Sequence, residues 1–412
     1  MKTKKHIVIV GAGFGGLQTA ISLSKRMGTL VDITLVDKHD YHLFSPNLYE
    51  VATSGEDLTN LSELRQHIVV PISRIISGTH IRFVQAEVES VNQKAREVGL
   101  GVKILPYTTL VIALGSVNDD HGTLGASEFA MPLKTLSDVF RIRNAIEFAF
   151  QAHRQDPVKK LIRIVVAGGG YTGVEFITEL ASAVPFLAWK NSIPRHKIEL
   201  EIIDSENVLI PGLNEKLSKD AKFRMQELGI RVRLNEKITR VDRQFVEYKS
   251  GERETYDVLV WAAGVKAYNL SFANPVVLGK QGRLVVNEYL QLKEHPEIYA
   301  VGDMAAVLNC DGQLAQCSVP DAWEQGGYVA YAIECAHFNR RPRIYHSKPH
   351  GFIVTLGGKW AIATNKYVYL KGMVGYIVRL FVHMRYYARI LGFFTAIKQI
   401  YGQADVFGKN DL

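Results

Sequence analysis

The feature that most constrains the fold is a pair of glycine-rich turns, each directly following an apolar run. Residues 11–16 read GAGFGG after the run 7–10, and residues 168–175 read GGGYTGVE after the run 162–167. In each turn three glycines fit the pattern G-x-G-x-x-G, which joins a strand to the N-terminus of a helix and lets backbone approach a pyrophosphate. A chain containing this unit twice is expected to hold two nucleotide-binding folds, unless the second site has lost its function.

The sequence around the first turn completes a nucleotide-binding unit. We expect a helix over 14–27 and a strand over 33–36 that ends in Asp37. Asp37 lies 21 residues past Gly16, a spacing at which a carboxylate can accept hydrogen bonds from ribose hydroxyls. The alternative is an ordinary turn aspartate.

The second turn is followed by the same elements at a longer spacing. We expect a helix over about 172–184, an insertion over 185–197, and a strand over 198–203 that ends in Asp204. No arginine stands beside Asp204. A carboxylate here suits a free 2′-hydroxyl and repels a 2′-phosphate, so the pattern predicts NADH rather than NADPH.

Three further apolar runs fit the same α/β architecture. Runs 110–115 and 258–264 each end in a small residue and glycine, as strands do where they return to a nucleotide site. The run 298–303 ends in Gly302-Asp303 before an expected helix. A chain of 412 residues with this alternation is predicted to form two or three α/β domains.

Cysteine usage and composition exclude several function classes. The three cysteines, Cys310, Cys317 and Cys335, form no CxxC pair, and the stretch 37–55 contains none. A disulfide reductase of this build would need a redox dithiol in that stretch, so this chemistry is excluded. No run of 18 uncharged apolar residues predicts a membrane-spanning helix. We also expect no metal site and no nucleic-acid partner, because neither ligand spacing nor a recognition module is visible.

The C-terminal region carries almost all of the net charge. Residues 346–412 contain nine Lys or Arg and two Asp, a net charge of +7 against +8 for the whole chain. A helix is expected over 376–391, with the apolar residues Ile377, Leu380, Phe381, Met384, Tyr387, Ala388 and Leu391 on one face. Arg379, His383, Arg385 and Arg389 share the other, expected to be exposed. This pattern favours a helix lying in an anionic membrane interface; the alternative is a helix packed on its own domain.

The motifs together resemble those of the flavoproteins with two dinucleotide-binding domains. Within that group the chain is similar to the type II NADH dehydrogenases, the single-subunit NADH:quinone oxidoreductases that do not pump protons. The resemblance runs through IVIVGAGFGGL, VDKHDYHLFSPNLYEVATSG, LVIALGS, PLKTLSDV, VVAGGGYTGVE, LVWAAGV and YAVGD. It implies non-covalent FAD in the first unit, NADH as substrate in the second, and a quinone that takes two electrons from the flavin.

The resemblance also implies which residues bind and react. The FAD contacts would be Gly11, Ala12, Gly13, Phe14, Gly15, Gly16, Asp37, Lys38, Val88, Ala113, Gly302 and Asp303. The NADH contacts would be Gly168, Gly170, Gly173, Asp204 and Gly264, with Glu175 close to nicotinamide and flavin as a candidate proton relay. The alternative for Glu175 is a first-turn glutamate that interacts with the helix dipole.

The chain departs from the family at residues 316–327, QCSVPDAWEQGG. Two glutamines usually line the quinone pocket there, and ungapped alignment places Pro320 and Glu324 at their positions. Glu324, if protonated, or the neighbouring Gln325 is then expected to contact the acceptor.

The predicted architecture is α/β. It has an FAD domain (1–115 with 283–345), an NADH domain (116–282), and a membrane-docking C-terminal region (346–412). The resemblance implies a peripheral protein on the cytoplasmic face of the cell membrane, and we expect a homodimer. Two alternatives stay open: a soluble flavin reductase with a non-quinone acceptor, and an NADH-sensing interaction protein.

Overall fold

The computed structural model describes residues 4–54, 61–155, 161–212, 215–309 and 312–407. The chain forms two compact units. The first unit comprises Met1–Leu43, Val69–Val117 and Val265–His350; the second comprises Phe44–Ile68, Asn118–Gly264 and Gly351–Leu412.

These boundaries differ from the predicted domains in three places. Residues 265–282, predicted for the NADH domain, group with the first unit. Residues 44–68 group with the second unit, because helix α2 (Leu48–Thr53) packs on α6 (Leu136–Gln155) and α7 (Tyr171–Asn191). The C-terminal region also groups with the second unit instead of forming a region of its own, because its first strand, β25 (Phe352–Thr355), packs on α7.

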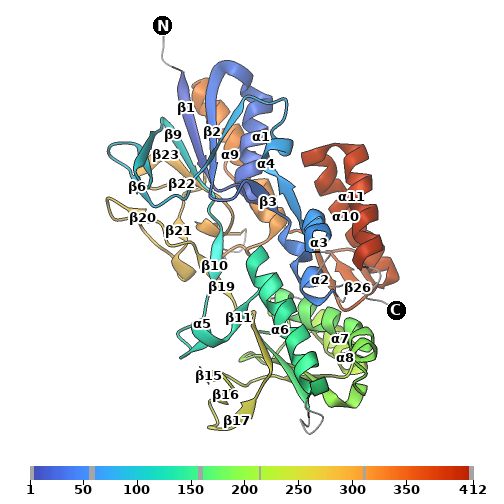
Figure 1. The fold of residues 1–412 in the computed structure, drawn as a ribbon. Helices are drawn as coiled ribbons and strands as arrows, with labels where there is room; N and C mark the ends of the chain where they lie inside the picture. Colours follow the sequence, from blue (N-terminus) through green and yellow to red (C-terminus); the bar gives the residue numbers. More distant parts are fainter. Residues whose placement is uncertain (1–3, 55–60, 156–160, 213–214, 310–311, 408–412) are drawn as a thin grey trace. The chain divides into compact units, whose positions relative to one another are not determined.

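A six-stranded, mainly parallel sheet forms the centre of the first unit (Figure 1). Its strands carry buried, β-branched runs, as expected for parallel strands covered on both faces. Helix α1 (Phe14–Met27) begins and ends as predicted and packs on α9 (Val319–His337). In order across the sheet the strands are β22 (Gln291–Leu292), β23 (His295–Ala300), β9 (Thr109–Ile112), β1 (Lys5–Val10), β2 (Val31–Asp37) and β5 (Ile81–Gln85).

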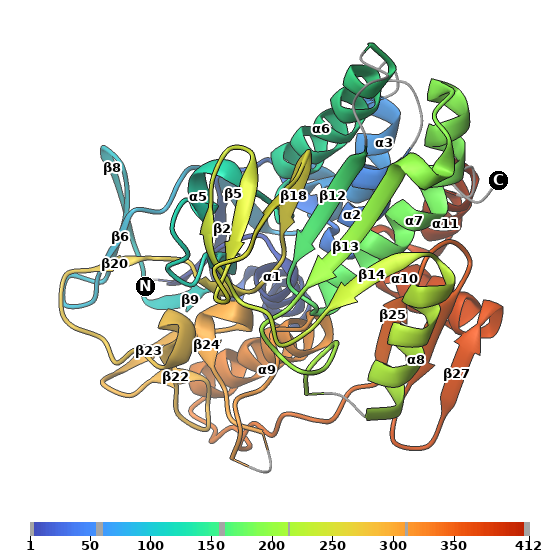
Figure 2. The same ribbon diagram turned by 90° about the horizontal axis from the view of Figure 1, so that it is seen from below.

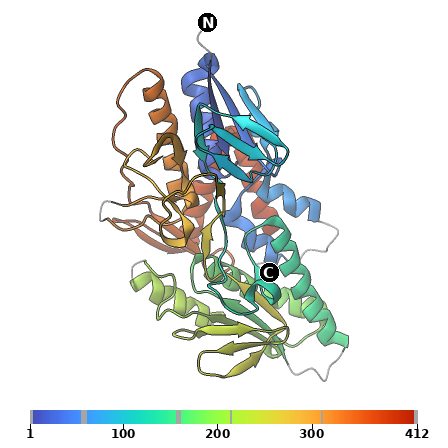
Figure 3. The same cartoon turned by 90° about the vertical axis from the view of Figure 1, so that its left-hand side faces the viewer.

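Smaller elements complete the first unit. A four-stranded sheet, whose antiparallel part is cyan in Figure 3, consists of β20 (Ser271–Phe272), β6 (Ser90–Asn92), β7 (Glu97–Leu100) and β8 (Lys103–Pro106). The other elements are β3 (Tyr41–Leu43), β4 (Val69–Pro71), α4 (Ile72–Ile75), β21 (Leu284–Val285) and β24 (Ala305–Ala306). Two further strands, β10 (Ser116–Asn118) and β19 (Val265–Ala267), form a separate two-stranded sheet.

The second unit repeats the parallel-sheet design (Figure 2). Its five strands lie in the order β11 (Met131–Pro132), β18 (Val258–Trp261), β12 (Ile162–Ala167), β13 (Ile198–Ile203) and β14 (Ile230–Arg233). Alongside them are α3 (Leu61–Ile68), α5 (Ala126–Phe129), α8 (Glu215–Glu227) and an antiparallel sheet of β15 (Ile238–Val241), β16 (Phe245–Tyr248) and β17 (Arg253–Thr255).

Helix α7 is longer than predicted. We expected it to end near residue 184, but it continues through Pro185 to Asn191. Leu187 and Ala188 extend its buried face, so packing holds the helix together beyond the proline, whose missing N–H would otherwise favour a break.

The C-terminal region forms a three-stranded antiparallel sheet and two helices. The elements are β25, β26 (Ala361–Thr364), β27 (Tyr369–Gly372), α10 (Met373–Leu391) and α11 (Phe393–Phe407). Figure 1 shows α10 and α11 side by side in red. Gly392, with a φ of +82°, separates them. Among the described residues, none of the helices has the length and apolar character needed to cross a bilayer.

Candidate functional site

The first glycine loop has the geometry of a phosphate cradle. Gly11 has a φ of +99°, and a Cβ there would lie 2.2 Å from the carbonyl oxygen of Ala113. A Cβ on Gly16 would lie 1.8 Å from the carbonyl oxygen of Gly11. A Cβ on Gly13, the N-cap of α1, would meet nothing within 4 Å. The first and third glycines are therefore required by the protein itself, whereas the second borders open space at the helix N-terminus, where a phosphate would bind.

Two side chains hold the peptide groups of Ala12 in this loop. Asp37 Oδ2 accepts a hydrogen bond from Ala12 N at 2.7 Å, and its Oδ1 accepts from His39 N at 2.8 Å. His42 Nδ1 lies 3.1 Å from Ala12 O. A carbonyl oxygen only accepts, so Nδ1 must carry the proton. Burial lowers the pKa of His42 to about 4, which keeps the ring neutral.

His42 is a candidate site residue that the sequence did not reveal. It lies in the short strand β3, and its ring meets that of Phe14 edge-on with the centroids 4.8 Å apart. A histidine in a short strand carries no motif. The contact between its ring and the glycine loop depends on how the chain folds back on itself.

The second glycine loop repeats the first almost atom for atom. Gly168 has a φ of +111°, and a Cβ there would lie 2.4 Å from the carbonyl oxygen of Ala262. A Cβ on Gly173 would lie 1.9 Å from the carbonyl oxygen of Gly168, while a Cβ on Gly170 would meet nothing within 4 Å. The second loop therefore keeps the same open cradle at the N-terminus of α7 and shows no steric sign of degeneration.

Asp204 in the second unit holds its loop in the way that Asp37 holds the first. Its Oδ2 accepts a short hydrogen bond from Gly169 N, and its Oδ1 accepts from Glu206 N at 2.7 Å. The carbonyl oxygen of Gly169 accepts from the backbone N–H of Ile210 at 2.7 Å, so a backbone group takes the part that His42 plays in the first unit. Ile210 adopts the left-handed region, with a φ of +51°.

Glu175 lies in the first turns of α7, just after this loop. Its Oε1 accepts hydrogen bonds from Thr355 N at 3.2 Å and from Thr355 Oγ1 at 3.0 Å. Desolvation raises the pKa of Glu175 to about 7, although the bonds from Thr355 and the charge of Arg379 act in the opposite direction. A carboxyl group that titrates near neutral pH is suited to general acid–base work.

The remaining predicted contacts are distributed over both units. In the first unit, Ala113 lies against Gly11, and Asp303 accepts a short hydrogen bond from Ser116 Oγ. Val88 is buried there, whereas Lys38 is half exposed and pairs with Glu87 at 3.9 Å. In the second unit, a Cβ on Gly264 would lie 2.8 Å from His121 Nε2.

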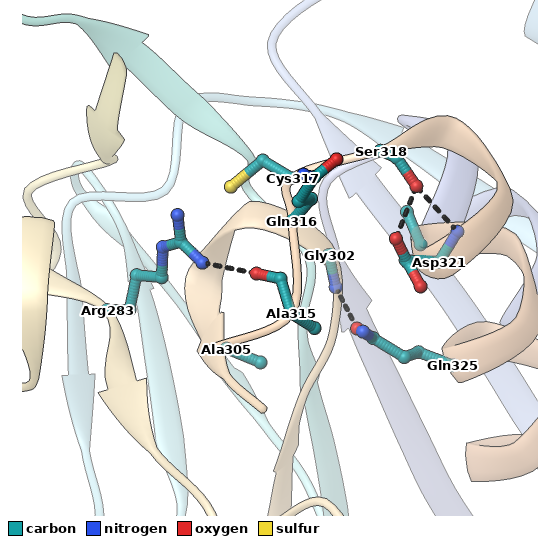
Figure 4. Close-up of a pocket in the computed structure, with 10 residues that line it drawn as sticks. Arg283, Gly302, Ala305, Ala315, Gln316, Cys317, Ser318, Asp321 and Gln325 are labelled. Carbon is teal, nitrogen blue, oxygen red and sulfur yellow. Dashed lines mark hydrogen bonds between the residues drawn. The ribbon is translucent and has the colours of Figure 1, made fainter. Parts of the chain in front are cut away.

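The predicted acceptor residues lie at the start of α9 and are already engaged within the first unit. Gln325 Oε1 accepts from Gly302 N at 2.7 Å, which ties α9 to the turn before Asp303 (Figure 4). Glu324 forms ion pairs with Lys348 and His350, each at 3.2 Å. Pro320 lies in the first turn, as expected of a helix start.

Ser318 caps α9, with its Oγ hydrogen-bonded to Asp321 (Figure 4). A small pocket is lined here by Arg283, Cys317, Asp321 and Gln325. Cys317 is exposed and Cys335 is buried, and neither forms a disulfide; Cys310 lies outside the described residues.

The C-terminal helix α10 corrects the prediction about its faces. We expected Arg379 and His383 to be exposed, but both are buried, at 4% and 8% exposure. Arg379 Nη1 lies 2.8 Å from Glu50 Oε1, and its Nη2 donates to Asn47 Oδ1 at 3.0 Å. A buried arginine needs such partners. His383 packs edge-on against Phe44, with the ring centroids 4.9 Å apart.

The opposite face of α10 is apolar and exposed. Met373, Val374, Ile377, Phe381 and Val382 are each between 46% and 62% exposed. Arg385 and Arg389 are exposed as predicted. In α11 the exposed apolar side chains include Phe393, Phe394, Ile397 and Tyr401, with Phe394 at 87%. The face that carries Arg379 and His383 therefore packs on the protein, and an aromatic, aliphatic face points away from it.

Comparison with known proteins identifies the family. A model described as pyridine nucleotide-disulphide oxidoreductase matches residues 5–326. The chain belongs to this family. Its three cysteines nevertheless provide no dithiol in the stretch 37–55, so the disulphide chemistry in the family's name is absent from that stretch.

Individual relatives agree with the resemblance inferred from the motifs. The type II NADH:quinone oxidoreductases of Staphylococcus haemolyticus and Staphylococcus aureus are 26% and 27% identical over 341 residues, which is 80% of this chain and 82% of each relative. The structure of NDH2 from Plasmodium falciparum in complex with NADH has a TM-score of 0.84 at 18% identity and covers 99% of this chain and 100% of that one.

A second enzyme class shares the fold. The sulfide:quinone oxidoreductase from Aquifex aeolicus has a TM-score of 0.77 at 19% identity, over 97% of this chain and 95% of that one. The predicted α/β fold with parallel sheets is confirmed.

Proposed function

We propose that this chain is a type II NADH:quinone oxidoreductase, which oxidises NADH and passes two electrons to a quinone without pumping protons. The observation that carries the proposal is the pair of matched glycine loops, of which only the second is followed by a carboxyl group that titrates near neutral pH. The curated relatives bear this activity in their names.

The first unit is the proposed FAD site. The residues fit the cofactor, because the cradle at Gly13 is open and no side chain caps the first turn of α1. The loop 11–16 would hold the pyrophosphate, Asp37 the ribose, and Asp303 the ribityl chain, with the backbone of Val88 and Ala113 alongside. When bound, FAD supplies the hydride acceptance and electron transfer that amino-acid side chains cannot perform.

The second unit is the proposed NADH site. The loop 168–173 would hold the pyrophosphate and Asp204 the ribose of the adenosine half, with Gly264 leaving space for the nicotinamide half. Asp204 already accepts from two backbone N–H groups, so its carboxylate is fixed where it would accept from ribose hydroxyls. A 2′-phosphate would meet this negative charge, and we expect NADH to be preferred over NADPH.

Glu175 is the proposed proton-handling group of this reaction. Reduction of a quinone takes up two protons along with two electrons, and a carboxyl group with a pKa of about 7 can both give and take a proton at neutral pH. Glu324 is the second candidate, although its two oxygens already lie 3.2 Å from Lys348 Nζ and 3.2 Å from His350 Nε2. Gln325 is the third candidate, and its Oε1 accepts from Gly302 N.

The direct test is an anaerobic stopped-flow experiment on the purified protein with its native flavin. Mixing with NADH should bleach the flavin absorbance, and a second mixing with a menaquinone or ubiquinone analogue should restore it within the turnover time. Rapid bleaching without quinone reoxidation would contradict the proposal and favour a reductase with another acceptor. A long-lived complex of NADH and flavin would favour an NADH-sensing protein. Protein purified without flavin would contradict the FAD assignment.

We further propose that α10 and α11 dock on an anionic membrane. Their exposed apolar side chains include four phenylalanine or tyrosine rings, Phe381, Phe393, Phe394 and Tyr401, and the exposed Arg385 and Arg389 lie on the same helices. Apolar rings buried at the acyl boundary, with cations near the headgroups, are the interactions that hold interfacial helices. A peripheral position on the cytoplasmic face of the cell membrane, and a homodimer, are the matching expectations for the intact protein.

Membrane docking is best tested by point substitution. Removing α10 would leave the buried Glu50 without its partner Arg379, and the protein would lose stability for a reason unrelated to the membrane. The double variant Phe381→Glu and Phe394→Glu should lose flotation with phosphatidylglycerol vesicles. Phe223→Glu is the matched control, because Phe223 in α8 is 63% exposed, like Phe381 at 62%. Equal flotation of the double variant and the control would contradict this role for the tail.

A further inference from the structure

The two oxygens of the Glu175 carboxyl group have different surroundings. Oε1 accepts from both the backbone N–H and the hydroxyl of Thr355, at 3.2 and 3.0 Å. Among the described residues no hydrogen bond reaches Oε2, and Glu175 keeps part of its surface exposed. One oxygen is therefore held by two donors, while the other is left for an outside partner.

The direction of each hydrogen bond follows from the chemistry of the groups. A carboxylate only accepts, so the single hydroxyl hydrogen of Thr355 points to Glu175 Oε1. Thr355 Oγ1 lies 2.6 Å from the hydroxyl of Tyr49. Because the hydrogen of Thr355 is already used, Tyr49 must donate its own to Thr355 Oγ1. Tyr49 and Thr355 are 3% and 2% exposed, so water does not compete for these bonds.

The fold explains why Thr355 is in this position. It is the last residue of β25, an edge strand whose other side pairs with β26 through Thr355 and Ala361. The backbone N–H on the free edge of β25 needs an acceptor. Helix α7 supplies acceptors one turn apart: Glu175 accepts from Thr355 N, and Glu179 Oε2 accepts from Gly358 N at 3.1 Å.

We propose that Thr355 and Tyr49 are positioning residues for Glu175: they clamp Oε1 and leave Oε2 as the oxygen that takes and gives the proton. This inference rests on the proposed function, in which Glu175 handles the proton. Two donors on Oε1 stabilise the carboxylate and make Oε1 the poorer site for the proton. The clamp also fixes the side-chain rotamer, so that Oε2 keeps one position in both protonation states.

Charged groups on several elements surround this clamp. Arg379 on α10 favours the ionised form of Glu175, whereas Glu50 on α2 opposes it. Glu179 and Tyr171 lie on α7 itself, and Arg379 is paired with Glu50 at 2.8 Å. The large opposing effect is desolvation, which raises the pKa to about 7. Losing the clamp leaves desolvation less opposed, so the pKa should rise further.

The test is a titration of the Glu175 carboxyl group in the holoenzyme. Glutamate labelled with ¹³C at Cδ gives a resonance that follows protonation, and Glu175→Gln identifies that resonance by removing it. Thr355→Val removes the hydroxyl with little change in volume, Thr355→Ser retains it, and Tyr49→Phe removes only the donor behind Thr355. Thr178→Val is the matched control. Thr178 is buried in α7, and its hydroxyl reaches the backbone carbonyl oxygens of Val174, Glu175 and Thr355 but not the carboxyl group.

We expect the titration midpoint of the Glu175 carboxyl group to move upward by about one pH unit in Thr355→Val. Tyr49→Phe should move it in the same direction by less, because the Thr355 bond to Glu175 remains. Thr355→Ser and Thr178→Val should titrate as the wild type does. The pH profile of NADH oxidation should shift with the same order of variants.

Two results would overturn the clamp: a wild-type midpoint in both Thr355→Val and Tyr49→Phe, or an equal shift in Thr178→Val. If Thr355→Val fails to fold, Tyr49→Phe against Tyr171→Phe decides the question. The NMR midpoint does not depend on a quinone. A protein that shows the expected midpoints without quinone turnover would keep the clamp and contradict the proposed function.

Discussion

The two glycine loops, 11–16 and 168–173, have nearly identical geometry and differ in what surrounds them. In both, the first and third glycines have no space for a Cβ, the second borders open space, and an aspartate after the next strand accepts from the loop backbone. The loop carbonyl is held by the His42 side chain in the first unit and by the backbone of Ile210 in the second. Steric demands fix the glycines of both loops, whereas the group that holds the loop carbonyl differs between the two units.

The helices that follow the loops differ at one equivalent position. Glu175 lies seven residues after Gly168, and Gln18 lies seven residues after Gly11. Gln18 is neutral and donates to Ser22 Oγ at 3.1 Å, whereas Glu175 is ionisable and clamped by Thr355. Only the helix of the second unit therefore carries a proton-exchanging group at this position.

The largest loss of stability is expected when the third glycine of either loop is replaced. In Gly16→Ala or Gly173→Ala the new Cβ would lie less than 2 Å from a backbone carbonyl oxygen. Backbone cannot yield as a flexible side chain can, so the free energy of unfolding should fall by about 4 kcal/mol or more. Urea denaturation followed by circular dichroism measures this. Wild-type stability in one variant but not in the other would show that the two loops are not equivalent.

A smaller change in stability is expected when Glu175 is replaced by glutamine, the residue type at the equivalent position 18. Its folded pKa of about 7 lies above the ordinary value of 4.5. The stability that it contributes is therefore complete below pH 4.5 and is lost as the pH rises through 7. Relative to the wild type, Glu175→Gln should gain up to about 3 kcal/mol in the free energy of unfolding between pH 4 and pH 8. Parallel stability curves for the two proteins over this range would contradict the assignment.

The smallest change in free energy is expected from His42, whose side chain holds the carbonyl oxygen of Ala12 in the first loop. His42→Ala removes one hydrogen bond to the loop carbonyl, and the FAD dissociation constant should rise about tenfold. The NADH dissociation constant should not change. His6→Ala is the control, because His6 is also in the first unit but bonds to Thr34. Equal flavin loss in both variants, measured by ultrafiltration and absorbance, would mean that His42 has no special role.

Local sequence predicted the parts of the site that are built from local contacts. The strand, glycine turn, start of the helix and terminal aspartate appear in both units close to the expected residues, because apolar runs and obligatory glycines determine them over short distances. The end of α7 was not predicted. His42 and Thr355 were missed, because their contacts join residues 30 and 180 positions apart. No periodicity or motif reports such a contact.

Helix α10 shows a different limit. The sequence analysis placed four cations on one face and assigned that face to solvent, but Arg379 and His383 are buried whereas Arg385 and Arg389 are exposed. Arg379 can be buried because Glu50 balances its charge and Asn47 accepts a hydrogen bond from it. These partners cannot be recognised from the periodicity of the tail. The charge pattern therefore did not predict which residues of α10 face the protein.

The most direct test of the central claim compares the second glycines, Gly13 and Gly170. A methyl group at either position meets no protein atom within 4 Å, so both alanine variants should fold with wild-type stability. If the first loop holds FAD and the second holds NADH, Gly13→Ala should lose bound flavin with the apo-protein still folded. Gly170→Ala should keep its flavin and bind NADH about tenfold to a hundredfold more weakly. Loss of flavin in Gly170→Ala, or unchanged flavin in Gly13→Ala, would contradict the assignment of the two nucleotides.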